Sequence, residues 1–332
     1  MKKTKQSNLI ERRIIMYRTE EWVSKLKSNK LRTPVTVPSY HRPNAPIFTS
    51  KIAKALTKDE FFVCIRNDPS EIANYKWLEE QSIATLVLLE NVHDLGETKG
   101  AIVAEFYKRG YKNIFMFDDT VTNLIINAPH VSKGGKTYFG NAKWSDTYSA
   151  LLLWEYLHNE YIGPEESEED KGAVYSSVGQ HKGYDWEPSL INASMCVNNK
   201  LTGNMFCIDI QTVVENNINY QSVYSAGVED INFPYTLLKA GLIIRAFTDL
   251  SYCMTNTQKQ VLEGGDNNAS PRAQRLEHIR KIFVENTLHR NWGDSLKDLG
   301  LKYYKTKHEG IAVVLDWKYW RDYYKNHKTE RR

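Results

Sequence analysis

Two pairs of adjacent carboxylates are the residues of this sequence best suited to chemistry. Asp118 and Asp119 close the apolar run NIFMFDDTV (113–121), and Glu229 and Asp230 lie in GVEDINF (227–233). Two neighbouring carboxylates repel each other, so the first pair either sits beside a cation or forms only a turn. Mg²⁺ and Mn²⁺ take carboxylate oxygens and share them with a substrate's phosphates. The second pair, at a predicted helix start, either complements the helix dipole or supplies a general base.

The elements that must position the first pair alternate between strand and helix. Strands are predicted over 33–43, 61–69, 84–91 and 113–119, with helices over 45–58, 70–82 and 101–110. The strands are apolar throughout, which is typical of a parallel sheet covered by helices on both faces. Ligands of such sheets bind at the carboxyl ends of the strands. The loops PSYHRP, RNDP, HDLGETKG and DDTV should therefore meet at one edge.

The GETKG loop (96–100) is a weaker signal. It precedes a helix but matches neither the Walker pattern nor GxGxxG, which disfavours a P-loop kinase or a Rossmann dehydrogenase. Lys99 either meets a phosphate at that helix start or is a solvated helix residue.

The second half of the chain is less regular. A helix is expected over 146–161 and strands over 174–180, 193–199 and 242–247. Residues 204–216 are predicted to form a strand that runs into a helix, and 224–241 a turn followed by a helix. We divide the chain into a basic N-terminal segment (1–32), two halves of one α/β domain (33–123 and 124–265) and a C-terminal helical, aromatic extension (266–332).

Composition and charge narrow the class of protein. The 332 residues contain no apolar run near the roughly 20 needed to cross a bilayer, and no signal peptide is recognised, so we expect a cytoplasmic protein with no membrane partner. Cys64, Cys196, Cys207 and Cys253 lack CxxC spacing, which favours free thiols over a zinc site. Residues 1–60 carry a balance of +9 and residues 270–332 a balance of +7, which leaves −12 between them. Basic ends suit contact with a polyanion, although solvated helix faces give similar counts.

In this order the motifs resemble the glycosyltransferases of GT-A fold, over roughly residues 33–265. The resemblance implies a UDP-sugar donor and Mn²⁺ or Mg²⁺. It also implies that residues 33–123 form the nucleotide-sugar-binding half and residues 124–265 the acceptor-binding half of the domain, and it implies the binding residues. The donor would be bound by Pro38, Ser39, Tyr40 and Arg42 of PSYHR, by Asn67 and Asp68 at the second strand end, by Gly96 and Lys99 near the diphosphate, and by Asp118.

The same resemblance gives roles to both carboxylate pairs. Asp119, with Asp118, would hold the metal, and Asp230, or failing it Glu229, would be the catalytic base of an inverting enzyme. The sequence has DDT where the family has DxD, and SYCMTNTQ lacks the C-terminal metal-binding histidine of many members. The candidates to replace that histidine are His278, His289 and His308, although histidines at such positions are more often surface or packing residues.

Within the fold, SYHRPN, the run GETKGAIVAEFYKRGYKNIFMFDDT and the later EGG look similar to phage enzymes that glycosylate modified DNA bases. The resemblance implies transfer of glucose or arabinose to the hydroxymethyl group of a modified cytosine in DNA. The basic ends favour DNA independently. Two alternatives stay open: a GT-A enzyme acting on a glycan, protein or small molecule, and a non-catalytic nucleic-acid-binding protein on a degenerate scaffold.

Overall fold

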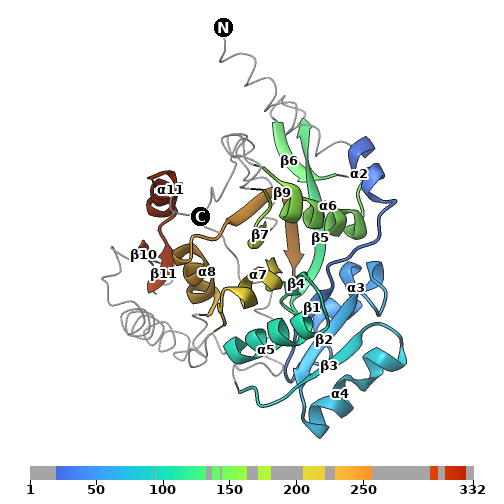
Figure 1. Cartoon of the computed structure of the whole chain (residues 1–332). Coiled ribbons are helices and arrows are strands. Elements are labelled where there is room, and N and C mark those ends of the chain that lie inside the picture. Colours follow the sequence, from blue (N-terminus) through green and yellow to red (C-terminus); the bar gives the residue numbers. More distant parts are fainter. Residues whose placement is uncertain are drawn as a thin grey trace.

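The computed structural model describes residues 20–93, 95–131, 137–142, 144–162, 171–180, 205–220, 229–255, 300–305 and 311–326. Its centre is a nine-stranded sheet in the order β3-β2-β1-β4-β8-β7-β9-β5-β6 (Figure 1). The strands are β1 (Val35–Pro38), β2 (Phe61–Arg66), β3 (Thr85–Leu89), β4 (Asn113–Phe117), β5 (Val121–Val131), β6 (Thr137–Asn141), β7 (Tyr175–Gln180), β8 (Met205–Asp209) and β9 (Ile244–Met254).

Strands β3, β2, β1 and β4 pair in parallel. Val35 of β1 lies opposite Phe61 of β2 on one side and Phe115 of β4 on the other. The pair β7–β9 is also parallel, whereas β8, β5 and β6 join the sheet through antiparallel pairs. The expected α/β fold with helices flanking the sheet is therefore confirmed. The four predicted strands of the first half are its parallel part.

Helices cover both faces of the sheet. They are α2 (Glu20–Leu26), the 3₁₀ turn η1 (Pro46–Thr49), α3 (Lys51–Ala55), α4 (Pro69–Glu80), α5 (Leu95–Lys108), α6 (Thr147–Glu160), α7 (Ile210–Glu215) and α8 (Glu229–Lys239). Side chains of α2, α3, α4 and α6 pack in one hydrophobic cluster, and those of α5, α7 and α8 in the other.

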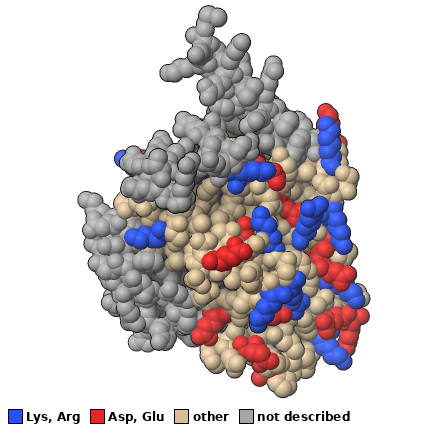
Figure 2. Space-filling view, viewed as in Figure 1, with Lys and Arg blue, Asp and Glu red and all other residues tan. Residues whose placement is uncertain are grey.

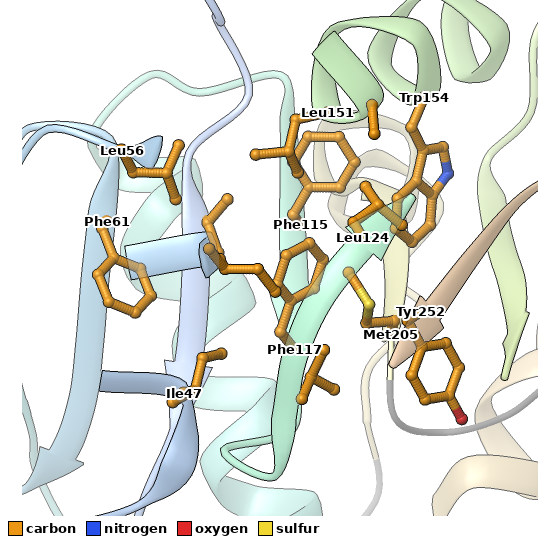
Figure 3. Close-up of a cluster of buried hydrophobic side chains, with 14 of the residues drawn as sticks. Ile47, Leu56, Phe61, Phe115, Phe117, Leu124, Leu151, Trp154, Met205 and Tyr252 are labelled. Carbon is orange, nitrogen blue, oxygen red and sulfur yellow. The ribbon is translucent and has the colours of Figure 1, made fainter. Parts of the chain in front are cut away.

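Strand β4 supplies both clusters because its side chains alternate. Phe115 and Phe117 enter the first cluster, where Trp154 of α6 packs 5.0 Å from Phe115 between ring centroids (Figure 3). Ile114 and Met116 enter the second. All five residues of β4 are buried, so the strand that ends at Asp118 is held rigidly from both faces.

Among the elements that differ from the expectations are α5, β5 and the C-terminal extension. Helix α5 begins at Leu95, so GETKG lies inside the helix and not in a loop; Glu97 Oε2 accepts the backbone N–H of His93 at 2.7 Å, which stabilises this earlier start. Strand β5 was not predicted, because it follows β4 after only three residues and contains Pro129. The third difference is in the C-terminal extension, which holds a hairpin, β10 (Leu301–Lys305) with β11 (Ile311–Leu315), before α11 (Trp317–Asn326).

The C-terminal elements lie beside α8 (Figure 1). Trp320 of α11 is buried against Tyr235, with ring centroids 5.8 Å apart. Cys64 and Cys207 are buried free thiols and Cys253 is a half-buried one, as expected. Cys196, the predicted strand at 193–199 and the region 256–299 fall outside the described residues. Within the described part, no helix is long and apolar enough to cross a membrane.

Candidate functional site

The carboxyl ends of β1 and β4 open into one cavity of about 280 Å³. It is lined by Pro38, Ser39, Tyr40, Arg42, Leu95, Lys99, Met116, Phe117, Asp118, Asp119 and Phe206. Seven of these were expected from the sequence to bind donor or metal: Pro38, Ser39, Tyr40, Arg42, Lys99, Asp118 and Asp119. Parallel β1 and β4 end side by side, which brings the PSYHR loop and the aspartate pair together.

The aspartate pair forms the short turn between β4 and β5. Asp118 is half-buried, and its Oδ1 accepts hydrogen bonds from Thr120 N at 2.9 Å and Thr120 Oγ1 at 2.6 Å. The backbone N–H of Val121 donates to the Asp118 carbonyl at 3.1 Å. The turn that was the alternative to a cation site is therefore present, and it directs Asp119 inward.

Asp119 is 5% exposed and accepts hydrogen bonds from two side chains of the PSYHR loop. Arg42 Nη1 lies 2.5 Å from its Oδ1, and Ser39 Oγ donates to its Oδ2 at 3.0 Å. Burial raises the pKa of Asp119 to about 7, because desolvation and the carboxylate of Asp118 outweigh the opposing effects of Arg42 and Ser39. This carboxylate therefore keeps its proton to a higher pH than an ordinary aspartate does.

A hard divalent cation fits this pair. Repulsion between the two carboxylates and the desolvation of Asp119 are both relieved by a nearby positive charge. Among the described residues no group of three or more His, Cys, Asp and Glu side chains could hold a metal, and Asp118 and Asp119 are the two carboxylates that line the cavity. His278, His289 and His308 lie outside the described residues.

Lys99 forms the cationic wall of the cavity from α5. It is 4% exposed, and its ammonium lies 5.7 Å from the ring centroid of Phe206 and 5.9 Å from that of Tyr220. The solvated alternative for Lys99 is therefore wrong. Gly96 is buried in the first turn of the same helix but does not line the cavity.

The side chains of the second acidic pair lie outside the described part of the structure, but a stack of rings links the helix that begins at this pair to the cavity. Tyr220 stacks on Phe233 with centroids 3.8 Å apart and planes inclined by 8°. Phe233 lies one turn after Glu229 and Asp230, which open α8. Because Tyr220 also lies beside the Lys99 ammonium, the Tyr220–Phe233 stack links α8 to the Lys99 wall of the cavity.

Asn67 and Asp68 lie outside the cavity. The amide nitrogen of Asn67 donates to Glu90, and Asp68 caps α4 by accepting from Ser70 N at 2.8 Å and Glu71 N at 3.3 Å. These hydrogen bonds hold the Asp68 carboxylate at the N-terminus of α4. Those from Ser70, followed by the one from Glu71, lower the pKa of Asp68.

Three residues that the sequence did not single out, Arg66, Glu71 and Tyr75, contact the PSYHR loop. Arg66 at the end of β2 lies with its guanidinium 3.9 Å from the ring centroid of exposed Tyr40, and donates to the His93 carbonyl at 2.7 Å. Glu71 and Tyr75 of α4 contact the PSYHR loop from below. Their spacing of four residues on one helix was the only signal in the sequence, and it indicates a shared face without saying what that face contacts.

No family model and no curated protein matches the sequence. Among solved structures, the chain is similar to glucosyl-3-phosphoglycerate synthase from Mycobacterium tuberculosis in complex with Mn²⁺, UDP and phosphoglyceric acid, with 13% identity and a TM-score of 0.43 over 91% of this chain and 95% of that one. It is similar to S. aureus TarS 1-349 in complex with UDP, with 12% identity and a TM-score of 0.38 over 80% and 73%. GalNAc-T7 with UDP, GalNAc and Mn²⁺ gives 11% identity and a TM-score of 0.41 over 91% and 58%. At this distance the likenesses assign no activity to the chain.

Proposed function

We propose that this protein is a GT-A type glycosyltransferase that uses a UDP-sugar and a divalent cation. The observation that carries the proposal is the cavity at the ends of β1 and β4, where cationic Arg42 and Lys99 face the carboxylates of Asp118 and Asp119. A nucleoside diphosphate needs this combination, because its negative charge requires cations and its metal requires oxygen ligands.

The residues divide the work of donor binding. Lys99 and Arg42 stabilise the diphosphate, whose charge grows as the sugar leaves. Asp118 and Asp119 would hold Mn²⁺ or Mg²⁺, which supplies a Lewis acid that neutralises the leaving group. Exposed Tyr40, which has the Arg66 guanidinium 3.9 Å and the His41 ring 3.7 Å from its ring centroid, would contact the donor at the edge of the cavity.

Transfer itself requires a base if the reaction inverts the anomeric centre. The carboxylate of Asp230, or failing it Glu229, takes the proton of the acceptor hydroxyl. The hydroxyl oxygen bonds to the anomeric carbon, the bond from that carbon to the diphosphate oxygen breaks, and UDP leaves. A retaining reaction needs no such base, so the anomeric configuration of the product separates the two.

The acceptor we propose is the hydroxymethyl group of a modified cytosine in phage DNA. The sequence resemblance and the basic balances of +9 over residues 1–60 and +7 over residues 270–332 support it. A glycan, protein or small-molecule acceptor is the alternative for the same donor site.

The test incubates the protein with Mn²⁺, a panel of UDP-sugars and hydroxymethylcytosine DNA, followed by mass spectrometry of the digested nucleosides. We expect a mass gain of one sugar on the modified cytosine. A gain on a glycan or peptide and none on DNA would overturn the acceptor. No transfer to any acceptor and no hydrolysis of any UDP-sugar would leave the non-catalytic alternative.

Asp119→Asn provides the variant for this experiment. It keeps the shape of the side chain and removes its charge, so we expect transfer to fall on the order of 100-fold. Asp59→Asn, which neutralises an exposed carboxylate remote from the cavity, should transfer at the wild-type rate. Equal rates for Asp119→Asn and wild type would contradict the role of Asp119.

A further inference from the structure

Helix α4 grips the loop that forms one wall of the cavity. Glu71 and Tyr75, one turn apart on α4, are 1% and 0% exposed. Glu71 Oε2 accepts the backbone N–H of His41 at 3.1 Å, and the Tyr75 hydroxyl accepts that of Arg42 at 2.9 Å. Neither residue lines the cavity, yet together they fix two consecutive backbone N–H groups of the loop.

The Tyr75 hydroxyl also orders the side chains of the loop. Its oxygen lies 2.8 Å from Ser39 Oγ. When Asp119 is ionised, Ser39 Oγ donates its single proton to Asp119 Oδ2, so the hydroxyl of Tyr75 donates to Ser39. Burial raises the pKa of Tyr75 to about 12, which keeps this donor protonated. A directed chain thus runs from Arg42 N–H through Tyr75 and Ser39 to Asp119.

Glu71 holds the loop in a conformation that an L-residue rarely adopts. His41 has a φ of 54°, in the left-handed region, and its Nδ1 also lies 2.5 Å from Glu71 Oε1. Because the backbone reverses at His41, the side chains of Tyr40 and Arg42 point in different directions. Tyr40 is 43% exposed over Arg66, whereas Arg42 contacts buried Asp119.

We propose that Glu71 and Tyr75 are positioning residues that hold the loop in its donor-binding conformation before the donor arrives. This rests on the proposed function, because it assumes that the cavity takes a nucleoside diphosphate. A loop fixed in advance loses less conformational freedom on binding, so the clamp improves affinity without touching the ligand. Its loss should weaken donor binding more than it slows the transfer step.

The test compares Tyr75→Phe with wild type in binding UDP in the presence of MnCl₂, by calorimetry. Phenylalanine keeps the buried ring and removes only the hydroxyl, so we expect the Kd for UDP to rise about 3- to 10-fold, the worth of one hydrogen bond. In UDP-sugar hydrolysis the KM should rise by a similar factor while kcat stays within about twofold of wild type.

Two further variants separate positioning from stability. Tyr148→Phe is the matched control, since the Tyr148 hydroxyl also accepts a backbone N–H, that of Leu31 at 3.1 Å, and donates to a carboxylate, Glu60 at 3.0 Å, remote from the cavity. It should lower the melting temperature without changing the Kd. Glu71→Gln keeps an acceptor for His41 N–H, so it should bind UDP more tightly than Glu71→Ala.

The outcomes are distinct. A wild-type protein that binds no UDP with Mn²⁺ overturns the proposed function and the inference with it. If wild type binds UDP, and Tyr75→Phe and Glu71→Ala bind UDP equally well, the inference alone is overturned. The inference is also overturned if the Kd for UDP rises as much in Tyr148→Phe as in Tyr75→Phe, or if Tyr75→Phe loses only kcat.

Discussion

Asp119 combines two roles that the sequence offered as alternatives, part of a turn and a group for a cation. The turn belongs to Asp118, whose Oδ1 accepts two hydrogen bonds from Thr120. Asp119, next to it, loses almost all contact with water and faces Arg42 and Ser39. An ion pair at 2.5 Å would normally lower a carboxyl pKa, but here desolvation is the larger effect. A second cation at this position is therefore electrostatically favourable.

The raised pKa of Asp119 makes stability depend on pH. Its folded pKa of about 7 lies above the ordinary aspartate pKa of 3.8, so its contribution to stability is fully present below about pH 4 and is lost as the pH rises through 7. In Asp119→Asn this loss is absent. From pH 5 to pH 8 the free energy of unfolding of the variant minus that of wild type should increase by about 2 kcal/mol.

The measurement is urea unfolding of both proteins without metal at several pH values. Asp59→Asn, an exposed carboxylate, should follow the pH dependence of wild type. Parallel curves for Asp119→Asn and wild type would show that the carboxylate is not held in the desolvated position described above.

At the scale of the elements, α4 and α5 each follow a strand of the parallel part and deliver groups to the cavity edge. Helix α5 begins at Leu95, so Lys99 lies in its second turn and reaches the cavity from a rigid helix. Helix α4 begins at Pro69, with Asp68 as its N-cap, and reaches the same edge through Glu71 and Tyr75. Asp68 thus starts the helix whose Glu71 and Tyr75 form hydrogen bonds with the PSYHR loop.

The connection from α6 to β7 gives an element-scale prediction. Gly172 has a φ of +76°, and a Cβ there would lie 2.7 Å from the carbonyl oxygen of Asn159 and 2.9 Å from that of His158. Its own carbonyl accepts from Arg245 Nε at 2.7 Å. Gly172→Ala must therefore distort the end of α6 as well as the turn. We expect it to lower the free energy of unfolding by about 3 kcal/mol or more.

Gly110 supplies the matched comparison after α5. It has a φ of +82°, but a Cβ there would meet nothing within 4 Å. Gly110→Ala should cost about 1–2 kcal/mol, the conformational penalty alone. Urea unfolding measures both variants, and equal losses would show that crowding at Gly172 adds nothing.

At the scale of the whole molecule, the sequence predicted the parallel half well because each of its strands is a continuous apolar run bounded by turn residues. Strands β1 to β4 all lie within the expected ranges. The other half depends on pairings between distant segments, such as β5 with β9, that local pattern does not encode. The same holds for the site: the motifs named seven cavity residues, but Tyr75 reaches Ser39 only through the packing of α4 on the sheet.

The surface charge limits where a polyanion could bind. On the face shown in Figure 2, acidic and basic side chains of the described residues are interspersed. The basic excess lies instead in the two ends of the chain. Helix α2 and the segment after it belong to the folded core, since Val23, Leu26 and Leu31 are buried. Residues 1–19 can therefore be removed without deleting any of these core residues.

Deleting residues 1–19 tests whether DNA contacts this end of the chain. The segment contains six Lys and Arg residues and one Glu. Each phosphate neutralised by a protein steepens the dependence of log K on log salt by about 0.9 on duplex DNA. If three or four of these cations contact phosphates, the deletion should make the slope shallower by about 3 and weaken DNA binding at least tenfold at low salt.

Fluorescence anisotropy over a salt series measures both the slope and the affinity. Lys108→Gln, at the exposed end of α5, is the control and is expected to keep the wild-type slope. An unchanged slope after the deletion, with UDP binding intact, would remove this segment from the DNA interface and favour a different acceptor for the same donor site.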